Sequence, residues 1–181
     1  MRLAGTVVAV SSSPTHGFSK AAKDRIVLVA GSGVEGDAHA GSYVRHRYHA
    51  RRSPRLPNLR QVHLIASELL EELRAIEYDV HPGNLGENVM TAGINLTRLP
   101  SGTLIRLGET AIVELTGLRT PCVLIDRFRK GLKKEMISDR AGEPKFHCGV
   151  LGVVRNGGSV AAGDKATVEL PTLPWSLLPA L

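Results

Sequence analysis

An arginine and a cysteine lie three residues apart in the part of the sequence best suited to chemistry. Arg119 and Cys122 fall within residues 117–126, directly after the Val-, Ile- and Thr-rich residues 111–116, which predict a strand. A thiol at a strand end with a guanidinium nearby would ionise readily and serve as a nucleophile or metal ligand. Residue type alone favours the opposite interpretation, because an unpaired cysteine is more often a small buried side chain.

The second cysteine is surrounded by apolar residues. Cys148 lies within residues 146–155, a run rich in valine that predicts a strand, so we expect this thiol in the core. The sequence places no His–Asp pair to activate a cysteine, which disfavours a thiol hydrolase. Two cysteines also do not form the pattern of a disulfide-stapled secreted protein.

Four glycines within residues 31–41 offer backbone amides that could bind an anion. The segment lacks the Lys-Ser/Thr of a P-loop, and its Gly-x-Gly-x-x-Gly pattern does not begin a helix, which disfavours dinucleotide binding. Asp37 and His39 could shape a site there, although a turn carboxylate commonly bonds to local amides. Glu87 and Asn88, at the start of another predicted strand, could also face a site, with capping of their loop as the alternative.

The excess positive charge is concentrated in one stretch. The formal net charge is +6, and residues 38–67 contain no acidic residue but hold six arginines, Arg45, Arg47, Arg51, Arg52, Arg55 and Arg60. We therefore expect an anionic partner to bind there. The tyrosines interleaved with these arginines are compatible with RNA binding. His39, His46 and His49 are compatible with zinc binding, and the third interpretation is a solvated loop. The histidines have no nearby cysteine and no helical pairing, which disfavours zinc.

Short apolar runs between 19 glycines and 10 prolines predict a mainly β protein. Strands are expected at residues 3–10, 25–30, 60–65, 103–107, 110–116, 146–155 and 166–170, and a polar loop at 15–24. A helix is expected at 68–77, with Ser67 as its N-cap and Leu69, Leu70, Leu73 and Ile76 on its buried face. Residues 128–140 are amphipathic and predict a second helix, and residues 156–159 a hairpin turn.

Length and composition favour one domain, residues 1–170, followed by a proline-rich apolar tail at 171–181. We expect the tail to pack on this domain or on a partner subunit, which allows a homodimer. No apolar run approaches the roughly 18 residues that cross a bilayer, so no membrane partner is expected. The first residues lead into a strand-like run rather than a signal peptide, and we expect a cytoplasmic protein.

Three blocks in order, residues 33–41, 82–91 and 119–122, together with residues 149–154 and Gly163-Asp164, resemble the MOSC domain. This is the C-terminal domain type of molybdenum cofactor sulfurases, a family associated with pyridoxal phosphate, and it also occurs as stand-alone bacterial proteins. The resemblance spans residues 3–170. It implies a closed, twisted β-barrel with a few short helices.

The resemblance also implies that Cys122 is the family's functional cysteine, either carrying sulfur as a persulfide or ligating molybdenum as a thiolate. A molybdopterin-type cofactor has a phosphate and a pterin, which require arginine, backbone amides and polar side chains. With Arg119 beside the thiol, the candidate cofactor-binding residues are Lys20, Glu35, Gly36, Asp37, His39, Arg45, Arg60, Glu87 and Asn88.

Partners are implied as well. The 181 residues leave no room for the pyridoxal-phosphate domain of the sulfurases, so sulfur is expected from a separate cysteine desulfurase. A reductase of N-hydroxylated compounds would need an electron-donor protein, because no iron–sulfur cysteine set or flavin motif occurs. The enzyme class stays open between oxidoreductase and sulfur transfer. The alternative is a β-barrel module that binds RNA or another polyanion through its basic loop without cysteine chemistry.

Overall fold

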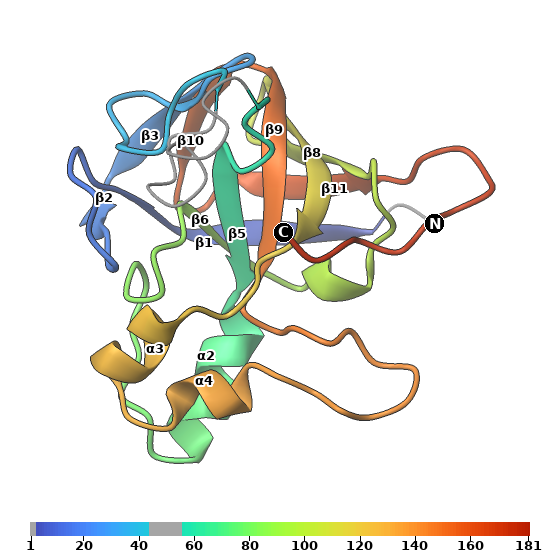
Figure 1. Cartoon of the computed structure of the whole chain (residues 1–181). Helices are drawn as coiled ribbons and strands as arrows, with labels where there is room; N and C mark the ends of the chain where they lie inside the picture. Colours follow the sequence, from blue (N-terminus) through green and yellow to red (C-terminus); the bar gives the residue numbers. More distant parts are fainter. Residues whose placement is uncertain (1–2, 44–55) are drawn as a thin grey trace.

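The computed structural model describes residues 3–43 and 56–181, and its main feature is a closed β-barrel (Figure 1). The strands are β1 (Ala4–Ser12), β2 (Ala21–Lys23), β3 (Arg25–Val29), β4 (Gly33–Val34), β5 (Val62–Ala66), β6 (Val89–Ala92), β7 (Leu104–Leu107), β8 (Ala111–Leu118), β9 (Val150–Asn156), β10 (Gly158–Ala161) and β11 (Lys165–Glu169). The helices are α2 (Ser67–Ala75), α3 (Val123–Phe128), α4 (Leu132–Glu135) and the short 3₁₀ helix η1 (Leu96–Arg98).

Pairing between β1 and β11 closes the barrel. The ring runs β1, β11, β7, β8, β9, β5, β6 and back to β1, while β2 pairs with the far end of β1 outside the ring. Only the β5–β6 pair of the ring is parallel. A separate sheet has the order β10–β3–β4. The predicted mainly β fold, a closed barrel with a few short helices, is therefore confirmed.

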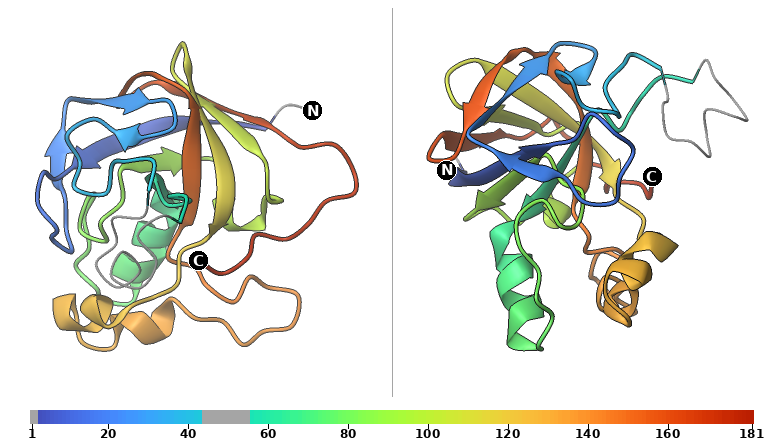
Figure 2. Two further views of the ribbon diagram at one scale, coloured as in Figure 1. Left: turned by 45° about the horizontal axis from the view of Figure 1, so that its top comes forward. Right: turned by 90° about the vertical axis from the view of Figure 1, so that its left-hand side faces the viewer.

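Two clusters of buried side chains form the core. The larger fills the barrel and follows the period-two alternation of strands such as β8, in which Ala111, Val113 and Leu115 are buried. The smaller cluster joins α2, α3 and α4 to one end of the barrel and contains Leu70 and Cys148. The right-hand view of Figure 2 shows all three helices at this same end. The chain leaving β8 passes directly into this helical end.

The first helix differs from its prediction at both ends. Ala66, not Ser67, is the N-cap residue, and Ser67 is the first helical residue. The helix ends at Ala75, so Ile76 lies beyond it and is 51% exposed. Leu70 and Leu73 are buried as predicted, and Leu69 packs partly buried against them.

Other local predictions were wrong for tertiary or backbone reasons. The predicted helix at 128–140 is replaced by α3 and α4, because the chain turns at Gly131, whose φ is 85°. Residues 156–159 do not form a hairpin turn, since β10 pairs with β3 rather than with β9. The polar loop at 15–24 contains β2, and the strand predicted from residue 146 begins only at Val150.

Replacing Leu64 by alanine tests the barrel core. Leu64 is 0% exposed in the larger cluster, so Leu64→Ala should lower the free energy of unfolding by about 2–5 kcal/mol. Val8 is 42% exposed, and Val8→Ala is the control that should change it by less than about 1 kcal/mol. Urea denaturation followed by circular dichroism measures both, and equal effects would contradict the assigned core.

Candidate functional site

Cys122 lies where the chain leaves the barrel for the helices. Its backbone is extended (φ −102°, ψ 168°), and it is the N-cap residue of α3. Just before it, the Arg119 amide donates to the Gly149 carbonyl at 3.0 Å, and the Cys148 thiol lies 2.8 Å from the Arg119 carbonyl. The segment is therefore fixed against the start of β9. The predicted strand exit followed by a helix is present, and Cys148 is fully buried as predicted.

A cavity of about 230 Å³ opens beside the thiol. Its wall comes from six separate parts of the sequence, which the closed barrel brings together. The lining residues are Gly17, Phe18, Lys20, His39, Asn58, Arg60, His63, Gly86, Asn88, Arg119, Thr120, Cys122, Leu124 and Leu151. Six of the sequence-predicted site residues are among them, so a single thiol shares one concave site with several cationic and amide side chains.

A buried ion pair supports one wall of this cavity. The Lys20 ammonium lies 2.8 Å from Asp37 Oδ2, with the two side chains only 5% and 2% exposed. Asp37 also accepts hydrogen bonds from the amides of Ser13 and His39 and from Asn88 Nδ2. It thus joins segments that are distant in the sequence, beyond the local turn role considered for it.

Burial and the opposite charge of the partner both change the pKa of Asp37 and of Lys20. Burial acts to raise the pKa of Asp37, but hydrogen bonds from His39 and the charge of Lys20 outweigh it and hold this pKa far below its usual value. Burial lowers the pKa of Lys20, and the charge of Asp37 opposes that effect. Asp37 is therefore ionised at neutral pH.

His63 is a site residue that the sequence analysis missed. It lies in β5, lines the cavity and is buried (6% exposed), with Nε2 2.8 Å from the Cys148 carbonyl. A carbonyl only accepts, so Nε2 carries the proton. Burial and the charge of Arg119 lower the pKa of His63 well below its usual value, and the ring is neutral. A histidine in an otherwise apolar strand was the available signal.

Arg119 carries an unmatched donor. Its Nη1 is buried and has no hydrogen-bond partner among the described residues, while its guanidinium carbon lies 5.9 Å from the centre of the Phe18 ring. Burial, and then the charge of Arg119, lowers the pKa of Arg60 on the same cavity. Arg119 and Arg60 thus bring two positive charges to one cavity, which suits an anionic ligand.

Asn88 lines the cavity, whereas its neighbour Glu87 does not. The Asn88 side chain accepts from the His63 amide and donates to the Ser11 carbonyl and to Asp37, so it links β5, β1 and the loop after β4 beside the cavity. Glu87 is 1% exposed, does not line the cavity, and accepts a short hydrogen bond from the Gly83 amide. Burial raises the pKa of Glu87. Its geometry is that of a carboxylate holding its own loop together.

The remaining sequence predictions lie away from the cavity. Glu35 and Gly36 are exposed in the turn after β4 and do not line it. Arg45, with the other arginines of the basic loop except Arg60, lies outside the described residues, as do His46 and His49. Within residues 3–43 and 56–181, no three His, Cys, Asp or Glu side chains are grouped to hold a metal ion.

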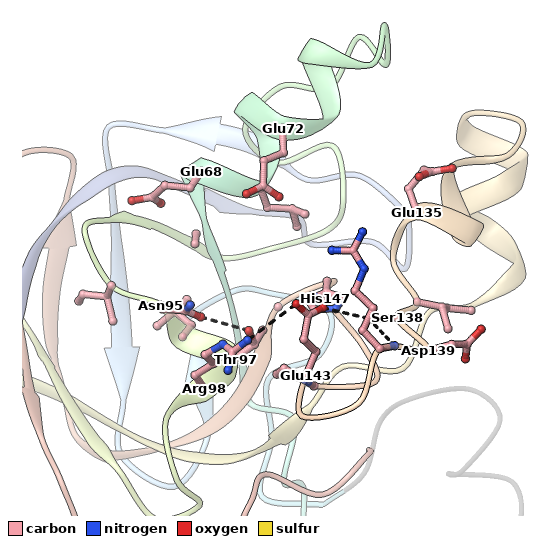
Figure 3. A pocket seen from close by; sticks show the side chains of 18 residues that line it. Glu68, Glu72, Asn95, Thr97, Arg98, Glu135, Ser138, Asp139, Glu143 and His147 are labelled. Carbon is pink, nitrogen blue, oxygen red and sulfur yellow. Dashed lines mark hydrogen bonds and ion pairs between the residues drawn. The ribbon is translucent and has the colours of Figure 1, made fainter.

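A larger cavity, of about 750 Å³, lies at the helical end (Figure 3). Carboxylates of α2, α4 and the following loop line it, together with Arg98, Arg140 and His147. Glu143 accepts a hydrogen bond from the Ser138 hydroxyl and lies 3.9 Å from the Arg98 guanidinium. None of the residues predicted to act in the site lies there, and it has no thiol in its lining. We place the candidate functional site in the smaller cavity, because only that one combines a thiol with unmatched positive charge.

The family model described as MOSC domain matches residues 39–167, and the chain belongs to this family. A curated relative, a protein named "Reductase" from Gibberella moniliformis, is 27% identical over 177 residues, which cover 94% of this chain. The chain spans only 28% of that relative's length.

Solved structures share the fold. The YuaD protein from Bacillus subtilis superposes with a TM-score of 0.73 at 21% identity, covering 95% of this chain and 99% of that one. YiiM from Escherichia coli gives a TM-score of 0.62 at 21% identity, covering 97% and 73%. No helix in the described part of the chain is long and apolar enough to cross a membrane.

Removing the charge of Asp37 should be strongly destabilising. Asp37→Asn leaves the Lys20 ammonium buried without a counter-ion, and we expect unfolding to become easier by about 3–5 kcal/mol. The double variant Lys20→Met/Asp37→Asn should recover part of this loss, because it removes the uncompensated charge. Urea denaturation of the wild type, the two single variants Asp37→Asn and Lys20→Met, and the double variant measures the coupling. Additive losses would show that the pair does not act as an ion pair.

His63 should make stability depend on pH. The pKa of His63 is lowered in the folded protein, below its value near 6.5 in the unfolded chain. The contribution of neutral His63 to the free energy of unfolding is therefore complete above about pH 6.5 and is lost as the pH falls below that value. From pH 6 to pH 5 the wild type should lose up to about 1.4 kcal/mol that His63→Gln does not lose. Urea denaturation at each pH tests this. Parallel stability curves for the two proteins would refute it.

Proposed function

We propose that this chain binds a molybdopterin-type molybdenum cofactor in the cavity beside Cys122, with the Cys122 thiolate as a ligand to molybdenum. The observation that carries this proposal is that the Cys122 thiol and the cationic side chains of Arg119 and Arg60 line one cavity. Membership of the MOSC family supports it, because this family is associated with that cofactor.

The residues around the cavity fit such a ligand. Arg119, Arg60 and Lys20, which line the cavity, would complement its negative charge. Asn88 and His63 hold the wall behind them, because Asn88 bonds to the His63 amide and His63 bonds to the Cys148 carbonyl. The cofactor, when bound, would supply two-electron redox chemistry. The protein would supply a soft thiolate ligand and a fixed positive field.

A redox role needs electrons from another protein. The chain contains only two cysteines and no flavin motif, so it has no iron–sulfur relay of its own. Its relative named a reductase is much longer, with this chain spanning 28% of it, which supports a function as the cofactor-binding component of a reductase. We propose N-hydroxylated compounds as the substrate class and a separate electron-donor protein as the partner.

Sulfur transfer is the second candidate, because Cys122 is the one thiol lining the cavity and is partly exposed. A desulfurase persulfide would pass its outer sulfur to the Cys122 thiolate, leaving a thiolate on the donor and a persulfide on Cys122. The pyridoxal phosphate of such a system would belong to the separate desulfurase.

Metal content separates the two candidates. Protein made in a host that synthesises molybdopterin should contain about one molybdenum per chain, and Cys122→Ser should lose it at least about tenfold, because a hydroxyl is a poor replacement for a thiolate ligand. Cys148→Ser is the matched thiol control, since serine can still donate to the Arg119 carbonyl. Elemental analysis and pterin fluorescence measure occupancy.

Three other outcomes would replace or reject the molybdenum-binding proposal. Cyanide-labile sulfur on Cys122 without molybdenum would replace the first candidate by the second. Neither signal from folded protein would reject both. Binding of RNA that weakens steeply with salt and is unaffected by Cys122→Ser would favour the polyanion-binding alternative.

A further inference from the structure

The end of the described chain lies alongside the segment that precedes Cys122. Ala180 pairs in parallel with Leu118 at the end of β8. The Leu118 amide donates to the Pro179 carbonyl at 2.7 Å, and the Leu181 amide donates to the Leu118 carbonyl at 2.9 Å. Figure 1 shows the C-terminus beside these strands. Residues 178–181 therefore extend the sheet at the point where the reactive segment leaves it.

Thr120 is held by the last of these residues, Leu181. Its amide donates to the Leu181 carbonyl at 3.0 Å, and its hydroxyl donates to the same oxygen at 2.8 Å. Arg119, one residue earlier, is held on the opposite side by Gly149 and Cys148. The two residues nearest the thiol on its N-terminal side that make these bonds, Arg119 and Thr120, are therefore held by two different segments. Cys148 and Gly149, just before β9, bind Arg119, and Leu181 binds Thr120.

Packing makes this contact close. Leu178 is 7% exposed and belongs to the barrel core, and a side chain at Gly117 would meet Leu181 Cγ at 2.5 Å. The preceding part of the tail is loosely held by comparison, with Leu173 75% and Leu177 90% exposed. The tail is therefore anchored mainly by its last residues, at the site.

We propose that residues 178–181 are a positioning strap for Cys122, which keeps the thiol and the Arg119 guanidinium facing one cavity. Displacing the strap frees the segment 119–122 on one side and changes the reactivity of the thiol. The consequence for cofactor binding rests on the proposed function. The strap itself is tested on the free protein, so it can fail or succeed independently of molybdenum binding.

Hydrogen exchange and thiol alkylation test the strap on three variants. A chain ending at Leu177 removes it, Thr120→Val removes only the hydroxyl bond, and Leu177→Ala is the control at an exposed position. In the shortened chain the amides of Leu118 and Thr120 should exchange about tenfold faster or more, because their acceptors are gone. The Arg119 amide, which faces Gly149, serves as the internal reference.

Alkylation by iodoacetamide, followed by peptide mass spectrometry, measures the reactivity of the Cys122 thiol. Cys122 should react about threefold faster or more in the shortened chain and by a smaller factor in Thr120→Val, with buried Cys148 unmodified. Leu177→Ala should match the wild type in both assays. The proposal is overturned if the Leu118 and Thr120 amides stay protected, if Cys122 reacts at the wild-type rate, or if exchange rises equally throughout the barrel.

Discussion

The buried ion pair between Lys20 and Asp37 is the interaction on which the shape of the site depends. Burying two charges costs several kcal/mol for each ion, and the pair is favourable only when further hydrogen bonds satisfy the remaining atoms. Asp37 meets that condition through two backbone amides and Asn88. Since these partners lie on separate loops, the pair joins those loops into the wall that faces Cys122.

The positive groups of the cavity act together on what can bind there. Arg119, Arg60 and Lys20 line a volume of about 230 Å³, while His63 behind them stays neutral because of burial and the Arg119 charge. Only Lys20 among these cations has a described carboxylate partner. This leaves a net positive site with a thiol at its edge, which suits an anionic ligand with an affinity for soft sulfur. The larger, carboxylate-rich cavity has the opposite character.

Local sequence patterns predicted much of the scaffold, and the family resemblance named several of the residues that line the cavity. The alternation of residues 110–116 and the apolar run at 166–170 correspond to β8 and β11, and Lys20, His39 and Arg60 do meet Cys122 at one cavity. Glu35 and Gly36 do not, because the turn at residues 35–36 faces solvent while the next residue, Asp37, is buried. Sequence proximity to a site residue was therefore a weak guide to position.

Long-range pairing was the part that sequence could not provide. The tail was expected to pack on the domain or on a partner, but nothing in residues 178–181 indicates that they pair with Leu118, because that register depends on barrel closure. The false hairpin at 156–159 has the same origin, since the choice between β9 and β3 as partner of β10 is tertiary. His63 was missed because its strand reads as apolar core.

The central claim is that the Cys122 sulfur binds molybdenum in this cavity. X-ray absorption at the molybdenum edge, measured on cofactor-loaded wild type and on Cys122→Ser reconstituted with excess cofactor, tests it most directly. The account predicts that the variant loses one sulfur scatterer from the metal shell relative to the wild type. Identical sulfur shells in the two proteins would contradict it.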